Sequence, residues 1–171
     1  LKQACELFEA DCTRQPFASK NGSLVVSPEN ARDSLTSFIK DAKRQLLIYD
    51  VNIQDSAFIQ LLKARAAAGV DVRIIGKAKG SEIDVRPLAT MRLHARAIVR
   101  DGEKVFVGSQ SLRRPELNLR REVGVVLADP GAMAPPLEVE VRTVQDCHQV
   151  HAADADEQVA GCEHRKPRSE R

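Results

Sequence analysis

The sequence lacks the strong net charge and the long apolar runs that would assign it to a class of protein at once. Its 171 residues include 26 basic and 24 acidic side chains, so the formal net charge is only +2. A bulk field therefore does not point to nucleic acid or to an anionic membrane, and any anion site must be built locally. Apolar runs such as residues 97–99 and 123–126 are far shorter than the roughly 20 residues that cross a bilayer. We expect a soluble or membrane-peripheral protein with no transmembrane segment.

Cysteine is also scarce, and its four copies lie two near each end of the chain, at Cys5, Cys12, Cys147 and Cys162. This distribution excludes a small secreted domain held together by many disulfides. The tail gathers the potential metal ligands Cys147, His148, His151, Cys162 and His164. Their spacing matches no closed Cys/His module, so we expect no metal there, although the i, i+4 spacing of Cys147 and His151 keeps zinc as the alternative. Residues 151–171 contain few large apolar side chains, which predicts a disordered polar tail.

The composition is otherwise that of an ordinary globular domain. Hydrophobic residues make up 43% and charged residues 29% of the chain. A chain of this length is enough for one domain with a real core, but not comfortably for two. It begins with Leu1 instead of methionine and shows no signal peptide, so we expect a fragment or a processed product.

Helix and strand signals alternate along the first part of the chain. Residues 5–15 predict a helix that stops at Pro16, and residues 24–26 predict a short strand. A second helix is expected to begin with Ser27 as its N-cap and Pro28 at its first position. Its apolar residues recur at i, i+3 and i+4, which is typical of a helix with one buried face.

The next segment predicts a strand–helix–strand unit. Residues 45–51, "QLLIYDV", are typical of a buried strand. Asp55 or Ser56 begins a helix that Gly69 ends, and residues 70–75 form the next strand. Two strands joined by a helix through short connections lie parallel in a sheet that helices cover. The unit therefore indicates an α/β fold.

The following segment predicts a hairpin and one more strand. Polar residues 76–89 are expected to form a loop that crosses to another part of the sheet. Residues 94–108 form two strands joined at Asp101-Gly102, because Asp-Gly is the strongest short hairpin signal. After an irregular or briefly helical connection, residues 122–129 predict a buried strand, and residues 137–150 predict a helix.

The hairpin carries an unusual pair of polar side chains. Residues two apart on a strand share a face, so His94 and Arg96 are predicted to project together. Ser109 begins a loop just past the second strand, which brings its hydroxyl and the loop N–H groups near His94. These donors and a guanidinium bind phosphate oxygens, and a neutral imidazole attacks phosphorus or moves a proton. On these residues alone, a structural hydrogen-bonding pair remains the alternative.

A longer pattern surrounds this pair. Its members are, in order, His94, Arg96, Asp101, Gly108-Ser109 and Glu122. One residue separates the first two, four separate the next two, and six separate Asp101 from Gly108. This pattern resembles the signature of the phospholipase D superfamily, in which a histidine, a lysine, an aspartate and a Gly-Ser-any-Asn sequence have the same spacings. The resemblance covers about residues 20–128 and includes the strand–helix–strand approach to the motif.

The resemblance implies a fold and a set of roles. The fold is a phospholipase D-like α/β sheet with helices on both faces and one motif copy. The implied roles are His94 as nucleophile or general acid, Arg96 and Ser109 as phosphate ligands, Ser111 as an auxiliary ligand and Glu122 as the group that orients the imidazole. Asp101 occupies the aspartate position of the catalytic set, although an Asp of an Asp-Gly turn is better suited to holding the hairpin. No cofactor and no metal is implied, because protein cations neutralise the phosphate.

Two positions depart from the family pattern. Arg96 stands where the family has lysine, and Ser111 stands where the family has the asparagine of Gly-Ser-any-Asn. A guanidinium keeps its charge but is larger and planar, and a serine hydroxyl has a shorter reach than an amide. A degenerate, non-catalytic repeat that scaffolds an active partner repeat is therefore one alternative.

The sequence contains one motif copy, whereas the resemblance implies two copies that face each other. In the family, one histidine forms a phosphohistidine and the other protonates the leaving group. We expect residues 1–19 to be the closing helix and linker of a preceding repeat, and residues 20–150 to be the phospholipase D-like domain. A second repeat in a longer chain is favoured over a homodimer partner.

The resemblance also implies a substrate class. Similarity to bacterial phospholipase D and cardiolipin synthase favours a phosphodiesterase or phosphatidyltransferase that acts on phospholipids through a phosphohistidine. A nuclease acting on DNA or RNA is the second candidate, and the small net charge weighs against it. Four arginines flank the Gly-Ser loop and form either a solvated face or an anion-binding patch: Arg113, Arg114, Arg120 and Arg121.

Overall fold

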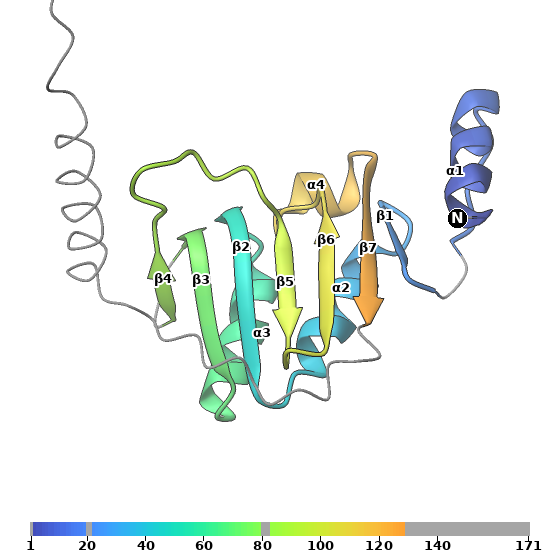
Figure 1. Cartoon of the computed structure of the whole chain (residues 1–171). Coiled ribbons are helices and arrows are strands. Elements are labelled where there is room, and N and C mark those ends of the chain that lie inside the picture. The colour runs from blue at the N-terminus through green and yellow to red at the C-terminus, as the bar shows by residue number, and fades with distance from the viewer. Residues whose placement is uncertain (1, 20–21, 80–82, 129–171) are drawn as a thin grey trace, which may run out of the picture. The chain divides into compact units, whose positions relative to one another are not determined.

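A computed structural model of the chain describes residues 2–19, 22–79 and 83–128, which all belong to one compact unit, Leu1–Pro136. The described strands form one mixed seven-stranded sheet in the order β1-β7-β6-β5-β2-β3-β4 (Figure 1). In chain order the described elements are α1 (Lys2–Thr13), β1 (Leu24–Ser27), α2 (Ala31–Lys40), β2 (Gln45–Ile53), α3 (Ser56–Ala67), β3 (Asp71–Ala78), β4 (Asp84–Arg86), β5 (Ala97–Arg100), β6 (Lys104–Gly108), α4 (Arg114–Asn118) and β7 (Glu122–Ala128). The predicted helix at 137–150 and the tail with its Cys/His cluster lie outside the described residues.

The strand–helix–strand unit forms as the sequence predicted. Strands β2 and β3 pair in parallel, beginning with Gln45 opposite Asp71. Helix α3 joins them, and the side chain of Asp55 caps its first turn by accepting the N–H of Ala57 at 3.1 Å. Gly69 ends the helical segment with a φ of +88°, a left-handed conformation that glycine adopts without a steric penalty. The α/β prediction is therefore confirmed.

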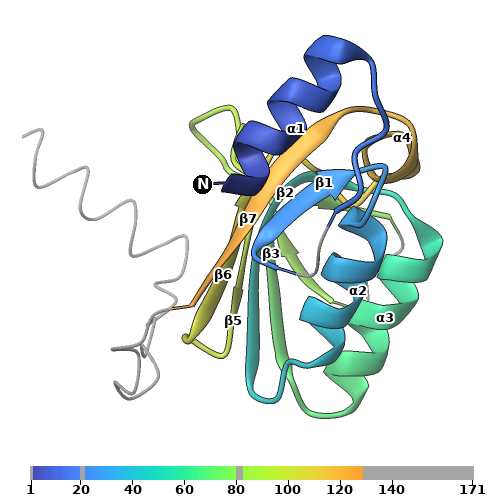
Figure 2. The ribbon, with the colours of Figure 1, turned by 90° about the vertical axis from the view of Figure 1, so that its right-hand side faces the viewer.

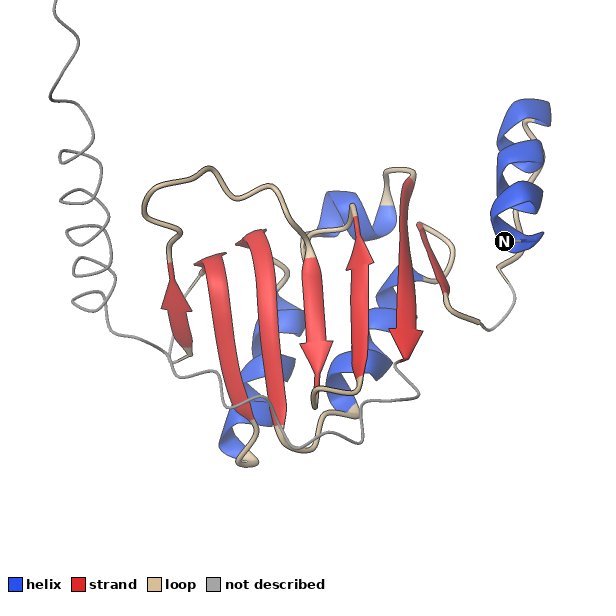
Figure 3. Cartoon of the chain, viewed as in Figure 1, coloured by secondary structure: helices blue, strands red, loops and turns tan. Residues whose placement is uncertain are grey.

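The main hydrophobic core lies between the sheet and the helices α2 and α3. Figure 3 shows these helices on the far side of the strands, and Figure 2 shows the same layer edge-on. The core side chains include Leu35 and Ile39 of α2, Phe58 and Leu62 of α3, and Ile48, Ile74, Ile98 and Phe106 of the sheet. Burial of apolar surface contributes roughly 25 cal/mol per Å², so this layer is the main source of stability.

Helix α1 lies on the opposite face of the sheet. Its residue Leu7 packs with Leu24 and Val26 of β1, whereas Val25 between them belongs to the main core. Successive strand residues point to opposite faces, so α1 and the pair α2 and α3 cover different faces. Helices on both faces were predicted, and the fold confirms this. Phe8, the next residue of α1, is 70% exposed.

Much of this second face is not covered by any described residue. Tyr49, Val107, Val123 and Leu127 expose 40%, 47%, 39% and 54% of their surfaces. Strand β7 is therefore half-buried, although its apolar sequence predicted a fully buried strand. Among the described residues, no helix is long and apolar enough to cross a membrane.

Two predicted boundaries are wrong for physical reasons. Ser27 does not cap a helix, because its backbone pairs with Glu122 as the last residue of β1. The chain then turns, and α2 begins only at Ala31, after Asn30. The predicted loop at 76–89 contains the short strand β4, which pairs in parallel with β3 at the edge of the sheet.

Candidate active site

The hairpin of β5 and β6 brings the two ends of the signature together. At this end the N–H of Gly108 donates to the carbonyl of Arg96, with an N···O distance of 3.2 Å. Strand β5 itself begins at Ala97, so the prediction that His94 and Arg96 lie within the strand is wrong. The reason is that the neighbouring strand β6 ends at Gly108. The N–H of the next residue, Ser109, donates to a carbonyl of β7 and not to β5.

His94 presents an accessible imidazole. The residue is exposed, and within the described part of the chain no hydrogen bond or ion pair holds its ring. Only its backbone is engaged, because its carbonyl accepts the Nη1–H of Arg96 at 2.8 Å. A neutral imidazole keeps a lone pair on one ring nitrogen, so this side chain can act as a nucleophile or as a proton carrier.

Two hydrogen bonds orient the guanidinium of Arg96. Nη1 binds the carbonyl of His94, and Nε donates to the hydroxyl of Ser111 at 3.3 Å. Ser111 is fully buried, at 0% exposure, and so lies behind Arg96. The two positions that depart from the family pattern thus contact each other. Two of the five N–H donors of the guanidinium are used in this way, and three remain for an anion.

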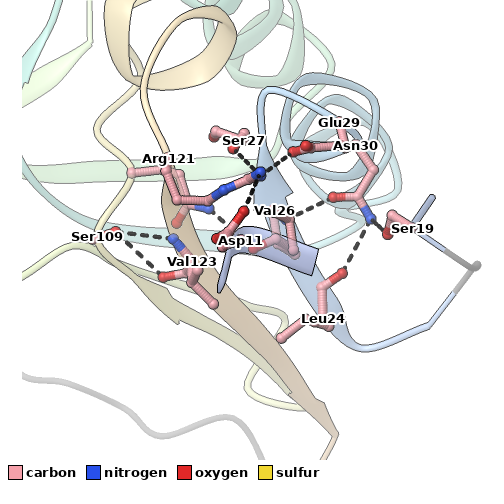
Figure 4. A network of polar contacts seen from close by, with 12 residues as sticks. Asp11, Ser19, Leu24, Val26, Ser27, Glu29, Asn30, Ser109, Arg121 and Val123 are labelled. Atoms are coloured by element: carbon pink, nitrogen blue, oxygen red, sulfur yellow. Dashed lines mark hydrogen bonds and ion pairs between the residues drawn. The ribbon is translucent and has the colours of Figure 1, made fainter. Parts of the chain in front are cut away.

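Ser109 lies at the exposed end of β6, and its hydroxyl bridges to β7 (Figure 4). The hydroxyl accepts the N–H of Val123 at 3.1 Å and donates to the carbonyl of the same residue at 3.4 Å. The residue before it must be glycine, because a Cβ on Gly108 would lie 2.8 Å from the Cα of Gly124 and 2.4 Å from Oε1 of Gln110. This close approach of β6 and β7 fixes the position of Ser109.

Glu122 is the first residue of β7 and is half-buried. Its backbone pairs with Ser27 of β1. Among the described residues, no hydrogen bond joins its carboxylate to the ring of His94. The orienting role that the resemblance implies for Glu122 therefore stays a prediction.

Arg121, the preceding residue, connects three segments beside Ser109 (Figure 4). Its guanidinium binds the carboxylate of Asp11 in α1 at 2.9 Å and that of Glu29 at 2.6 Å. It also donates to the carbonyl of Ser27 at 3.0 Å. Helix α1 is thereby tied to the end of the sheet that carries the signature.

Asp101 lies at the opposite end of β5. It forms a type I′ turn with Gly102, with φ values of +57° and +73°, as the Asp-Gly pair predicted. Its carboxylate accepts three successive backbone N–H groups, those of residues 43–45, at 2.7–3.2 Å. Partial burial raises the pKa of Asp101, but these N–H groups outweigh it and hold the pKa below its ordinary value. Seven residues of extended chain, about 20 Å, separate it from His94, so its position favours the structural role.

Two carboxylates that the sequence did not single out lie beside the Gly-Ser loop. Asp50 and Glu116 are each only 2% exposed. Asp50 accepts the N–H of Leu112 at 2.7 Å, and Glu116 accepts the N–H of Ser111 at 2.6 Å. Burial raises the pKa of Asp50. Burial also acts on Glu116, but its hydrogen bonds with Arg113 and Ser111 hold the pKa of this carboxyl below its ordinary value.

One of these carboxylates had a recognisable signal in the sequence. Asp50 follows Leu46 and Ile48 at intervals of two, so the strand period places an acid at a core position. Glu116 is buried by the packing of α4, a five-residue helix whose sequence shows no apolar periodicity. Only the tertiary structure reveals it.

Three of the four arginines that flank the Gly-Ser loop form ion pairs with acidic side chains. Arg113 and Arg120 both pair with Glu116, and Arg121 has the acidic partners described above. Arg114 is exposed and makes no ion pair among the described residues. Within the same residues, no group of three His, Cys, Asp or Glu side chains is placed to hold a metal ion. The tail Cys/His cluster lies outside this part of the chain.

These features define an α/β domain that brings His94, Arg96 and the Gly-Ser loop together at one end of its sheet. Comparison with known families identifies it further: residues 35–143 match the family described as cardiolipin synthase, phospholipase D-like domain. The chain belongs to this family. Its predicted membership of the phospholipase D superfamily, a group of phosphodiesterases and phosphatidyltransferases, is therefore confirmed.

Solved structures share the fold. Nuc from Salmonella typhimurium, a phospholipase D family member, is 21% identical with a TM-score of 0.57, and the match covers 85% of this chain and 97% of that one. NucT from Helicobacter pylori is 17% identical with a TM-score of 0.52, covering 80% and 92%. Polyphosphate kinase from Porphyromonas gingivalis is 16% identical with a TM-score of 0.59, covering 90% of this chain and 24% of that one. At these identities the likeness shows the fold alone. No curated protein matches the sequence.

Proposed function

We propose that the chain supplies one half of a phosphodiester-cleaving or phosphatidyl-transferring site, with a phospholipid as its substrate. The observation that carries the proposal is the accessible imidazole of His94 beside the oriented guanidinium of Arg96. Membership of the cardiolipin synthase-like family favours a phosphatidyl substrate.

The chemistry follows from these two groups. Arg96 neutralises the non-bridging oxygens of the phosphodiester, so the phosphorus is more easily attacked. A ring nitrogen of His94 forms the new bond to phosphorus, and the bond to the leaving alkoxide breaks. Water, or the hydroxyl of an acceptor lipid, then displaces the histidine and completes hydrolysis or transfer.

A second copy of the domain completes the site. In an in-line displacement the leaving oxygen lies opposite the attacking nitrogen, so one imidazole cannot serve both positions. A second histidine must donate the proton to the leaving group. It comes from a partner copy of this chain or from a second repeat in a longer chain. One copy of this fold accounts for 97% of the Nuc chain, which supports pairing between separate chains.

The test compares His94→Ala, Arg96→Ala and Arg96→Lys in the complete assembly. His94→Ala should lower kcat by about 10²–10⁴-fold while substrate binding stays largely intact, because the lost group acts in the chemical step. Arg96→Ala should impair both kcat and KM, since charge is lost from the ground state and the transition state alike. Arg96→Lys should be the mildest change. A folded His94→Ala protein with the wild-type kcat would end the catalytic assignment and leave the scaffold alternative.

A nucleic acid is the second candidate substrate. The observation that favours it is the pair of exposed cations that flank the signature residues, Arg92 and Arg114, neither of which has an ion pair among the described residues. The same kinetic series should therefore be run with phosphatidylglycerol vesicles and with a nucleotide phosphodiester. The substrate with the higher kcat/KM identifies the class.

A further inference from the structure

Asp50 and Glu116 are the only two charged side chains among the described residues that are buried, and the proposed reaction does not use them. Burying a carboxylate is costly unless hydrogen bonds and opposite charges compensate for the lost hydration. Both carboxylates lie beside the loop that carries Ser111, and neither touches the solvent-exposed ring of His94. What they bind therefore indicates what they do.

Each carboxylate holds one of two consecutive N–H groups of the loop. Glu116 accepts the N–H of Ser111 at 2.6 Å through one oxygen and pairs with Arg113 through the other. Asp50 accepts the N–H of Leu112 at 2.7 Å and that of Asn52 at 2.9 Å. Hydrogen bonds to a charged acceptor are about twice as strong as neutral ones, so these contacts fix the loop firmly.

The carbonyl side of the loop is fixed as well. The carbonyl of Leu112 accepts the N–H groups of Gln54 and Asp55 at 3.1 and 3.0 Å. The carbonyl of Ser111 accepts the N–H of Arg113 at 2.7 Å. These contacts fix the backbone at Ser111, and its side chain is fully buried, so packing confines the hydroxyl that contacts Arg96.

Ser111 in turn restrains the side chain of Arg96, because its hydroxyl accepts the Nε–H of that residue. A free arginine side chain samples many rotamers, and ordering it on binding costs affinity. Here Nε is bound to Ser111 and Nη1 to the carbonyl of His94, so the plane of the guanidinium is set before a phosphate arrives. The Nη2 edge has no hydrogen bond within the described residues and stays available to an anion.

We propose that Asp50 and Glu116 are positioning residues for phosphate: they fix Ser111 and, through it, the direction in which Arg96 presents its guanidinium. This inference rests on the proposed function of His94 and Arg96 as the phosphate site. It assigns to the buried carboxylates a role in substrate affinity in addition to their contribution to folding.

The experiment compares Asp50→Asn, Glu116→Gln and Ser111→Ala with a matched control, Asp55→Asn. Asp55 is also a partly buried carboxylate that holds backbone N–H groups and pairs with an arginine, Arg32, but its side chain does not touch Ser111. Its loss should reduce stability without changing the site. All proteins are compared in the same oligomeric state, at a temperature where each is folded.

Two measurements are made on each protein. The first is the hydrogen exchange rate of the Arg96 Nε–H, followed by nitrogen-15 NMR and assigned by its absence in Arg96→Lys. The second is the Kd of inorganic phosphate. Loss of one such hydrogen bond is worth roughly 1 kcal/mol, so we expect about fivefold faster exchange and about fivefold weaker phosphate binding in the three variants. Asp55→Asn should match the wild type in both.

The outcomes separate the inference from the proposed function. Unchanged exchange and unchanged phosphate affinity in folded Asp50→Asn and Glu116→Gln would overturn the inference. If those two proteins do not fold, Ser111→Ala decides alone, because it removes a single oxygen and disconnects Arg96 from the carboxylates. Wild-type protein that does not bind phosphate would also overturn it. If the variants behave as expected but no phosphodiester is cleaved, the positioning role stands and the proposed enzymatic function fails.

Discussion

Asp101 shows how one residue can satisfy a signature and still act far from the chemistry. Its backbone occupies a turn with positive φ, and its carboxylate accepts the N–H groups of residues 43–45, the last of which begins β2. The position therefore links the β5–β6 hairpin to the central strand β2. A residue at this place affects the site only through the fold.

Removal of the Asp101 carboxylate should destabilise the protein in a pH-dependent way. Asp101→Asn tolerates the positive φ but loses the charge, and we expect it to lower the free energy of unfolding by about 1–2 kcal/mol at pH 7. The native pKa lies below the unfolded value of about 3.9, so this contribution is complete above about pH 5 and is lost as the pH falls through the native pKa. Urea unfolding at pH 7 and near pH 2 measures the difference. A variant that unfolds like the wild type at pH 7 would contradict the assignment.

Gly108 should be intolerant of any side chain, because β6 and β7 approach closely there. Gly108→Ala should cost about 1–3 kcal/mol of stability through overpacking against Gly124 and Gln110, and should lower activity by displacing Ser109. Gly102→Ala is the matched control, since its Cβ would meet nothing within 4 Å and only its φ of +73° is strained. Thermal unfolding and kcat/KM distinguish the two: the control should lose stability and keep its activity.

At the scale of elements, local signals predicted those parts of the fold that local chemistry determines. The Asp55 cap, the left-handed Gly69 and the Asp101-Gly102 turn each act within a few residues, and all three were predicted. Ser27 was assigned wrongly because its partner, Glu122, lies 95 residues away in the sequence. The strand period marks Asp50 as a core position, but its partner Leu112 lies 62 residues away, and the burial of Glu116 has no local signal. The contacts of both carboxylates with the loop therefore could not be predicted from the sequence.

Arg121 should control how firmly α1 is held. Arg121→Ala removes the ion pairs to Asp11 and Glu29, and we expect a loss of about 1 kcal/mol because the pairs are partly exposed. Hydrogen exchange of the α1 peptide should then be about fivefold faster, while the α3 peptide is unchanged. Arg114→Ala, which removes an exposed guanidinium without an ion pair among the described residues, is the control. Equal exchange of α1 in both variants would show that packing around Leu7 is sufficient.

At the scale of the whole molecule, the single motif copy makes activity depend on pairing. If two copies of this chain form the site, specific activity should rise with protein concentration through the monomer–dimer transition. A verified monomer should have little activity, because one imidazole cannot serve both sides of the phosphorus. Sedimentation at the assay concentrations gives the state of the protein. Robust turnover by the monomer would contradict the two-copy mechanism.

The two edges of the described sheet limit how copies can meet. Strand β4 at one edge has only three residues, and two of them, Asp84 and Arg86, are exposed and paired with each other at 3.1 Å. At the other edge β1 has four residues and lies under Leu7 of α1. Short, charged or covered edges resist the addition of a further strand. We therefore expect two copies of this domain to meet through a face or an end of the sheet and not to form one continuous ladder.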